Sequence, residues 1–272
     1  MSSTAIRRLV LSSMLALTLL VGSIPVVALA HTSPSTDSRF AVSDLFDIVN
    51  VNVGDLSADG RWLAATATSL RDRIGVDNYR FGDPTYVAPS LSEVLVIDTQ
   101  TASTQKIFSG SAKRQVRGLR WSPDASRLAM LVLTGDLFAP MLWERTSGKL
   151  RDVEVPKGKH VPENTELRWS PDGSRLLFAM RSNEWIEKAR RQFNLETKGP
   201  VVVHSSKEPF LAWDDLRRMS LTRSLAAFDL KTGQINEILP EMKLRSYELS
   251  EDGTFISYQD DITKKTDYDV IG

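Results

Sequence analysis

A short turn phrase that occurs four times constrains this sequence more than any other feature. Each copy is preceded by a large apolar residue and followed by an apolar run typical of a strand. The copies are Ser-Ala-Asp-Gly-Arg (57–61), Ser-Pro-Asp-Ala-Ser-Arg (122–127), Ser-Pro-Asp-Gly-Ser-Arg (170–175) and Ser-Glu-Asp-Gly-Thr (250–254). Recurrence of one strand–turn–strand unit is the mark of a repeat architecture. The chain is therefore expected to fold as a series of similar antiparallel units.

The residue types in the phrase are those of a tight turn. Ser and Asp side chains hydrogen-bond to nearby backbone N–H groups, Pro presets φ, and Gly supplies a positive φ. We interpret the polar turn residues as structural, in preference to metal ligands or catalytic carboxylates. They are Asp59, Gly60, Asp124, Asp172, Gly173, Asp252 and Gly253. Ala125 stands where the other copies have Gly, which predicts a less demanding turn in that copy.

A second polar turn follows three of the predicted strands. It ends the segments 94–101, 141–148 and 226–233, and a further strand-like run follows at 149–155 and 234–239. One unit is thus strand, Asp-Gly turn, strand, loop, strand, Thr-Gly turn, strand. Four antiparallel strands in this order make one blade of a β-propeller. The predicted fold is an all-β propeller of four-stranded antiparallel blades.

The phrases also predict where the blades begin and end. The expected blades are about 50–116, 117–163, 164–244 and an incomplete 245–272. The intervals between the turn aspartates are 65, 48 and 80 residues, against roughly 40–50 for a bare blade. The excess lies in insertions at 70–90 and 181–223. Since a closed propeller has about four to eight blades, three and a half blades predict the front part of a longer protein.

The paired phrases resemble the blade repeats of TolB-like and prolyl-oligopeptidase-type β-propellers, from about residue 50 onward. Trp169-Ser-Pro-Asp-Gly-Ser-Arg-Leu-Leu-Phe-Ala179 carries the resemblance best. In the dipeptidyl aminopeptidase and acylaminoacyl-peptidase relatives, such a propeller lies ahead of an α/β-hydrolase domain, restricts access and holds the peptide substrate. The resemblance therefore implies the substrate-gating propeller of a serine peptidase. The alternative is a non-catalytic TolB-like periplasmic scaffold that binds protein partners.

The search for catalytic motifs within the chain is negative. There is no Gly-x-Ser-x-Gly, no P-loop and no Gly-x-Gly-x-x-Gly, so we assign no catalytic residue and no cofactor to these residues. The downstream hydrolase domain that the resemblance implies would carry the triad, and it could also support an oligomer. Exopeptidase and endopeptidase action both stay open, as does the side-chain specificity.

Metal and nucleic-acid sites are not expected either. The chain has no Cys, and the three histidines (His31, His160 and His204) do not have metal-ligand spacing. The acids between Asp260 and Asp269 lack the spacing of a calcium loop, which favours a polar hairpin. The formal net charge is zero, so no basic field for nucleic acid is indicated.

The second insertion contains a predicted helix that is a candidate for substrate binding. Residues 181–193 place Asn183 at the N-cap and Trp185, Ala189 and Phe193 on one face. The spacing also predicts i,i+4 ion pairs, which are Glu184–Lys188 and Glu187–Arg191. A solvated surface helix is the plainer interpretation.

The resemblance gives this helix a second interpretation. Dipeptidyl-peptidase relatives carry a glutamate pair on a short helical insertion and use it to bind the substrate ammonium. Glu184, Trp185 and Glu187 are loosely similar to that arrangement. Trp213 and Asp214 form a second candidate wall, with a simple loop anchor as the alternative.

Residues 1–30 read as a signal peptide and not as part of the fold. Arg7 and Arg8 form the charged region, residues 9–21 the apolar region, and Ala28-Leu-Ala30 a cleavage site. The apolar stretch is shorter than the roughly 20 residues of a membrane span, so no stable anchor is expected after cleavage. The protein is predicted to be exported, periplasmic or secreted, with residues 31–49 as a tail and lead-in.

Overall fold

The computed structural model describes residues 40–110, 112–199, 201, 205, 207–210 and 212–264. The predicted signal peptide, residues 31–39 of the predicted tail and lead-in, and the last eight residues lie outside the described residues. The same is true of His31, His204, Asp267 and Asp269. The account below concerns the compact unit Val42–Gly272.

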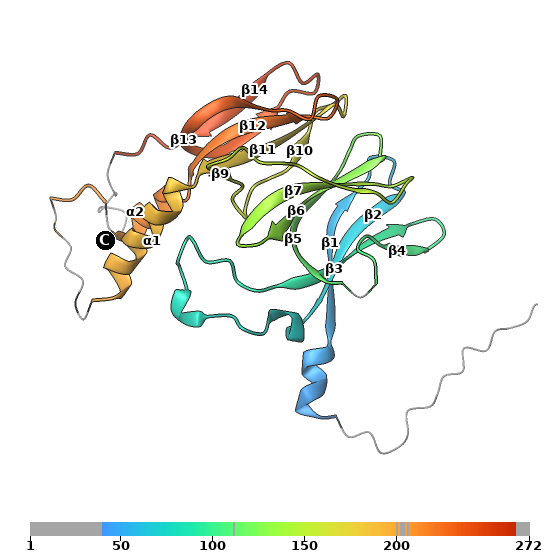
Figure 1. Cartoon of the computed structure of the whole chain (residues 1–272), viewed down its shortest axis with the longest axis horizontal. Coiled ribbons are helices and arrows are strands. Elements are labelled where there is room, and N and C mark those ends of the chain that lie inside the picture. The colour runs from blue at the N-terminus through green and yellow to red at the C-terminus, as the bar shows by residue number, and fades with distance from the viewer. Residues whose placement is uncertain are drawn as a thin grey trace, which may run out of the picture. The chain divides into compact units, whose positions relative to one another are not determined.

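The first four strands pair in chain order as one antiparallel unit (Figure 1). They are β1 (Val49–Leu56), β2 (Trp62–Ser69), β3 (Leu91–Asp98) and β4 (Thr104–Lys106). A short helix, η1 (Val42–Asp47), precedes them. The long β2–β3 connection contains η2 (Leu70–Arg73) and η3 (Asn78–Arg80), and it forms the first of the two predicted insertions.

The next four strands repeat this pattern. They are β5 (Arg114–Trp121), β6 (Arg127–Thr134), β7 (Leu137–Glu144) and β8 (Leu150–Asp152). The β6–β7 hairpin pairs without a register shift from Arg127↔Glu144 to Thr134↔Leu137. Two residue pairs between β3 and β5 join this unit to the preceding one.

A third unit follows, with the helices inside it. Its strands are β9 (Lys159–His160), β10 (Arg168–Trp169), β11 (Arg175–Ser182), β12 (Thr222–Asp229) and β13 (Ile235–Leu249). The β11–β12 connection carries α1 (Glu184–Thr197) and α2 (Ala212–Met219). The first half of β13 pairs with β12, whereas its second half pairs with β14 (Ile256–Asp260). Strand β13 therefore links two successive units.

The four turn phrases share one hydrogen-bond frame. In each, the Ser hydroxyl donates to the Asp carboxylate at 2.5–2.6 Å and accepts the backbone N–H five residues later. Ala125 has φ +53°, in the same left-handed region as Gly60, Gly173 and Gly253. The prediction of a less demanding turn at Ala125 was therefore wrong. The side-chain frame holds the same turn without the glycine.

The buried side chains lie between successive sheets. Leu128, Met130 and Val132 of β6 pack toward the first unit, whereas Ala129 and Leu131 of the same strand pack toward the third. Because successive strand residues point to opposite faces, β6 is buried on both sides. The described residues are thus mostly β, in repeated antiparallel units packed face to face with a short helical segment. This confirms the predicted all-β class of repeated antiparallel units with a short helical insertion.

The helices of the described residues are short. Neither α1 nor α2 nor any of the three 3₁₀ helices has the length and hydropathy of a membrane span.

Candidate functional site

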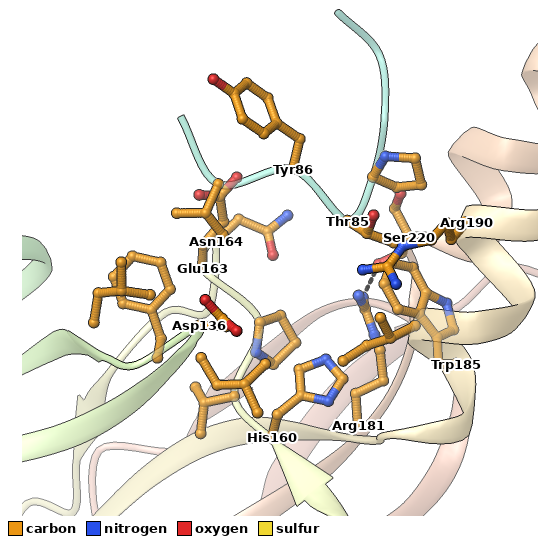
Figure 2. A pocket seen from close by; sticks show the side chains of 18 of the residues that line it. Thr85, Tyr86, Asp136, His160, Glu163, Asn164, Arg181, Trp185, Arg190 and Ser220 are labelled. Atoms are coloured by element: carbon orange, nitrogen blue, oxygen red, sulfur yellow. Dashed lines mark hydrogen bonds between the residues drawn. The ribbon is translucent and has the colours of Figure 1, made fainter. Parts of the chain in front are cut away.

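The two insertions meet at one cavity of about 670 Å³ (Figure 2). The β2–β3 connection contributes Arg80 and residues 84–87, and the β11–β12 connection contributes residues of α1 and Ser220. The remaining walls come from the β6–β7 hairpin and from residues 160–164, which begin at the end of β9. Segments far apart in the sequence therefore build the cavity at one edge of the second and third units.

Arg181, at the end of β11, is the most buried charged group of the cavity, with 4% of the residue exposed. Its Nε donates to the carbonyl oxygen of Thr222 at 2.6 Å, and its Nη2 donates to that of Ser220. The guanidinium carbon lies 3.8 Å from the ring centroid of Trp185. Burial lowers the pKa of Arg181 to about 10, so the group stays charged at neutral pH.

Two further guanidinium groups lie on the same cavity. Arg80 donates to Asp83 at 2.7 Å and stacks on Tyr86, with 4.6 Å between its guanidinium carbon and the ring centroid. Arg190 of α1 is about half exposed and lies 3.7 Å from the carboxylate of Glu187. Arg80 has a close counter-ion, Arg190 has a distant one, and Arg181 takes part in none of the ion pairs among the described residues.

Two carboxylates come from other elements. Asp136 lies in the β6–β7 turn, and Glu163 lies in the segment after β9. Figure 2 shows both on the side of the cavity away from Arg181 and Arg190. Although Glu163 is exposed by surface area, the surrounding protein desolvates its carboxyl group and raises its pKa, and Arg117 acts in the opposite direction. The cavity therefore has a basic side and an acidic side.

His160 forms part of the cavity floor and connects β9 to the start of α1. Its Nδ1 lies 3.0 Å from Oδ1 of Asn183, and its ring centroid is 6.3 Å from that of Trp185. Burial lowers the pKa of His160 below its ordinary value of 6.5. The neutral ring with Nδ1–H donating to Asn183 is the form that this environment favours.

Asn183 is at the predicted N-cap position but does not cap the helix. Its backbone is already helical (φ −65°, ψ −25°), and its side chain makes no capping hydrogen bond. A capping side chain needs a non-helical, usually extended backbone. The contact with His160 uses the side chain instead, which the local sequence does not reveal.

The predicted binding residues of α1 separate in the structure. Trp185 lines the cavity, and its Nε1 donates to the carbonyl oxygen of Met219 at 2.7 Å. Trp185, Ala189 and Phe193 form the buried face of α1, as predicted. Glu184 and Glu187 are exposed and do not line the cavity.

The ion pairs of α1 also differ from the prediction. Neither Glu184–Lys188 nor Glu187–Arg191 forms, and the pair that does form is Glu187–Arg190, spaced i,i+3. Side chains three and four apart on a helix are both neighbours, so the spacing alone does not choose between them.

Trp213 and Asp214 lie on α2, outside the cavity lining. The Trp213 ring meets Phe193 edge-on at 6.3 Å, and it also covers Gly82 of the first insertion. Asp214 pairs with Arg217 at 2.6 Å. Trp213 thus joins the two insertions and does not face the cavity as predicted for a binding wall.

Sequence reasoning missed the groups that do line the cavity. Arg181 and Arg190 lie in the segment 181–193, whereas Asp136 and Glu163 lie in two other segments, and the four share no motif. One signal was available, because Arg181 directly follows the buried run 176–180 and charged residues are rarely buried without a partner. Within the part of the chain that the structure describes, no three His, Asp or Glu side chains gather as metal ligands would.

No protein-family model and no curated protein matches this sequence. Among solved structures, the chain is similar to oligogalacturonate lyase from Vibrio parahaemolyticus, with 14% identity and a TM-score of 0.48 over 74% of this chain and 44% of that one. It is also similar to TolB from Acinetobacter baumannii, with 13% identity and a TM-score of 0.42 over 77% of this chain and 37% of that one.

A third similar structure is the acylaminoacyl peptidase of Pyrococcus horikoshii. The identity is 10% and the TM-score 0.45, over 78% of this chain and 28% of the peptidase. The chain therefore spans less than half the length of each of these three proteins. These are distant likenesses of fold to β-propeller domains, and two of the three names describe different activities, a lyase and a peptidase.

Proposed function

We propose that this chain is the substrate-gating propeller of an exported serine peptidase and that the cavity receives the peptide. One observation carries the proposal: both insertions, which the blades do not need for strand pairing, converge on the same cavity. Ligand sites are concave and carry a few polar groups of fixed position. The blade phrases, which resemble those of the peptidase family, supply the reaction class.

A peptide suits the chemistry of this cavity. Its ammonium group can be bound by carboxylates such as Asp136 and Glu163, and its carbonyl and carboxyl oxygens by guanidinium groups such as Arg181. Trp185 offers an apolar ring beside these charges. Peptide-bond cleavage through an acyl-serine intermediate would fall to a hydrolase domain that these residues do not include. Export through residues 1–30 is part of the same proposal.

Binding to the purified chain tests the role of the cavity. Titration calorimetry with short peptides should show binding without hydrolysis. Glu163→Gln should weaken binding of peptides with a free amino end at least threefold, because it removes a charge from the cavity wall. Glu184→Gln, which is exposed on α1 and does not line the cavity, is the matched control. Equal affinity of both variants and wild type for these peptides would contradict the proposed site.

Labelling tests the reaction class. A fluorophosphonate probe, which reacts with activated serines, should label the native gene product in extracts of the source cells and should not label the 272-residue chain. Absence of label on a native product that binds peptide would refute the peptidase assignment.

The non-catalytic scaffold is the second candidate, and one observation favours it. Val49, Val51 and Val53 of β1 are 56%, 57% and 68% exposed. Since they alternate along the strand, they share one face of it, and an apolar stripe of this kind is typical of surfaces that other proteins cover. Retention of a defined protein partner by the native product, together with no probe labelling, would select the scaffold.

A further inference from the structure

We infer that the cavity selects peptides that carry a carboxylate and that Arg181 and Arg190 bind this group. This inference rests on the proposed function, because it names the ligand class of the same cavity. The carboxylate is either the carboxyl end of the peptide or an acidic side chain, since both present the same planar pair of oxygens.

The first argument is the missing counter-ion of Arg181. A buried charge is costly unless it is paired and hydrogen-bonded. Among the described residues, the guanidinium of Arg181 donates to two carbonyl oxygens and lies against the Trp185 ring, but it forms no ion pair. Arg223 lies near enough to lower the pKa of Arg181 further, and Glu241 opposes this without forming an ion pair with it. An anion that enters the cavity would supply the missing charge.

The second argument is the number of donors that stay available. A guanidinium has five N–H donors, and Arg181 uses two of them on Thr222 and Ser220. None of its nitrogens is among the buried side-chain atoms without a partner in the described residues. Nη1, for which no hydrogen bond to the described residues is found, is therefore not sealed off, and its N–H groups are accessible from the cavity that the residue lines.

The third argument is that Arg181 is held in one orientation. The ring of Trp185 covers one face of the guanidinium, and the two carbonyl oxygens fix its plane. Trp185 itself is fixed by the hydrogen bond to Met219. A guanidinium that is already oriented loses less entropy when it forms a two-point contact with a carboxylate.

Arg190 and the two carboxylates on the opposite side of the cavity add to the selectivity for a peptide carboxylate. Arg190 is half exposed and only loosely paired, so it can turn toward an anion at little cost. Asp136 and Glu163, on the opposite side, repel a second carboxylate and attract an ammonium group. The ligand is thus expected to lie with its carboxylate at the Arg181 side and its positive end at the Glu163 side.

The test is calorimetry on the whole 272-residue chain with three related peptides. They are a neutral peptide with a free carboxyl end, its carboxy-terminal amide, and the same amide with one Gln replaced by Glu. We expect the free acid to bind at least tenfold more tightly than the amide. Recovery of affinity by the Glu-containing amide would assign an acidic side chain as the source, and failure to recover would assign the carboxyl end.

Variants locate the effect. Arg190→Gln should weaken binding of the acid about fivefold and leave the amide unchanged, whereas Arg191→Gln, the next residue on α1 and outside the cavity, should change neither. Arg181→Lys should remove most of the preference for the acid, and its circular dichroism and melting curve show whether it is folded. If Arg181→Lys does not fold, the effect of Arg190→Gln on binding of the acid and of the amide still tests the inference.

The outcomes separate the inference from the proposed function. Equal binding of acid and amide by the wild-type chain, with binding still weakened by Glu163→Gln, overturns the inference and leaves peptide binding in place. Binding of none of the three peptides overturns both. A preference for the acid that Arg190→Gln and Arg181→Lys leave intact also overturns the inference.

Discussion

At the scale of single residues, the hydrogen bonds of the Ser and Asp side chains determine the backbone conformation of the turn more than the glycine does. The Ser–Asp pair holds the backbone of each turn through two N–H groups, as at Ser122 and Asp124. Ala125 therefore adopts φ +53° in spite of its Cβ. A left-handed conformation costs a non-glycine residue roughly 1–2 kcal/mol, which is no more than two good hydrogen bonds contribute.

Two glycines of the same turn type should respond differently to substitution. Gly60 and Gly253 have φ of +71° and +70°, but a Cβ on Gly60 meets no atom within 4 Å, whereas one on Gly253 would lie 2.9 Å from Cδ of Pro171. Gly60→Ala should lower the free energy of unfolding by about 1 kcal/mol. Gly253→Ala should lower it by about 1 kcal/mol more, because the proline ring must move.

Urea denaturation of the purified chain measures both values. The additional loss in Gly253→Ala should shrink when it is combined with Pro171→Ala, which removes the clashing ring. Equal losses for the two single variants would mean that the ring of Pro171 does not restrict a side chain at position 253.

His160 gives the fold a dependence on pH. Its pKa is lowered by burial, so the folded state holds this proton less tightly than the unfolded state. The stability that the neutral ring supports is present above about pH 6.5 and is lost as the pH falls from there through the lowered pKa. His160→Gln, which can still donate toward Asn183, should remove this part of the pH dependence.

Melting temperatures between pH 7.5 and 5 provide the measurement. The wild-type chain should lose stability faster than His160→Gln as the pH falls. Parallel curves for the two proteins would show that folding does not lower the pKa of His160.

At the scale of elements, sequence reasoning succeeded where the cause is local. The β6 and β11 strands follow from apolar runs bounded by turn residues, and the buried face of α1 follows from Trp185, Ala189 and Phe193 at helical spacing. The cavity could not be found this way. Its walls depend on which loops meet in space, and the position of Asp136 opposite Arg181 leaves no trace in local periodicity.

The helix α1 depends on its buried face and not on its charges. Trp185→Ala removes the ring that packs on His160 and Arg181 together with the hydrogen bond to Met219. We expect the free energy of unfolding to fall by about 3 kcal/mol. The β11–β12 connection should loosen first, because the strands pair with one another without Trp185. Glu184→Ala, exposed on the same turn, should change stability by less than about 0.5 kcal/mol.

Hydrogen exchange distinguishes local from global loosening in these variants. Trp185→Ala should speed exchange in α1 and α2 and leave β6 and β7 nearly unchanged. Uniform acceleration over all strands would show that the helices are part of the cooperative core.

At the scale of the whole molecule, one buried ion pair connects the helical insertion to the segment that directly follows β14. Nη1 of Arg218, on α2, donates to Asp261 at 2.9 Å, and Nη2 donates to the carbonyl oxygen of Thr263 at 2.7 Å. The two side chains are 9% and 2% exposed. Phe210 covers the guanidinium, and Arg245 approaches the same carboxylate at 3.4 Å.

The Arg218–Asp261 ion pair also influences the groups that line the cavity. Met219 and Ser220 directly follow Arg218, and their carbonyl oxygens accept the hydrogen bonds that hold Trp185 and Arg181. An ion pair outside the cavity thus fixes the backbone that orients the groups inside it. Loosening the end of α2 should therefore disturb ligand binding as well as stability.

Asp261→Asn tests this connection. The substitution leaves the charge of Arg218 buried without its principal counter-ion. Nε of Arg218 already has no hydrogen-bond partner among the described residues. The free energy of unfolding should therefore fall by about 3 kcal/mol. Peptide affinity should fall as well, and exchange in α2 should speed up. Arg217→Gln, on the exposed side of the same helix with a side chain 78% exposed, should change none of these. If Asp261→Asn lost stability but kept its affinity for peptides, the carbonyl groups of Met219 and Ser220 would have to be held by the strands alone, and the cavity would be independent of the Arg218–Asp261 ion pair.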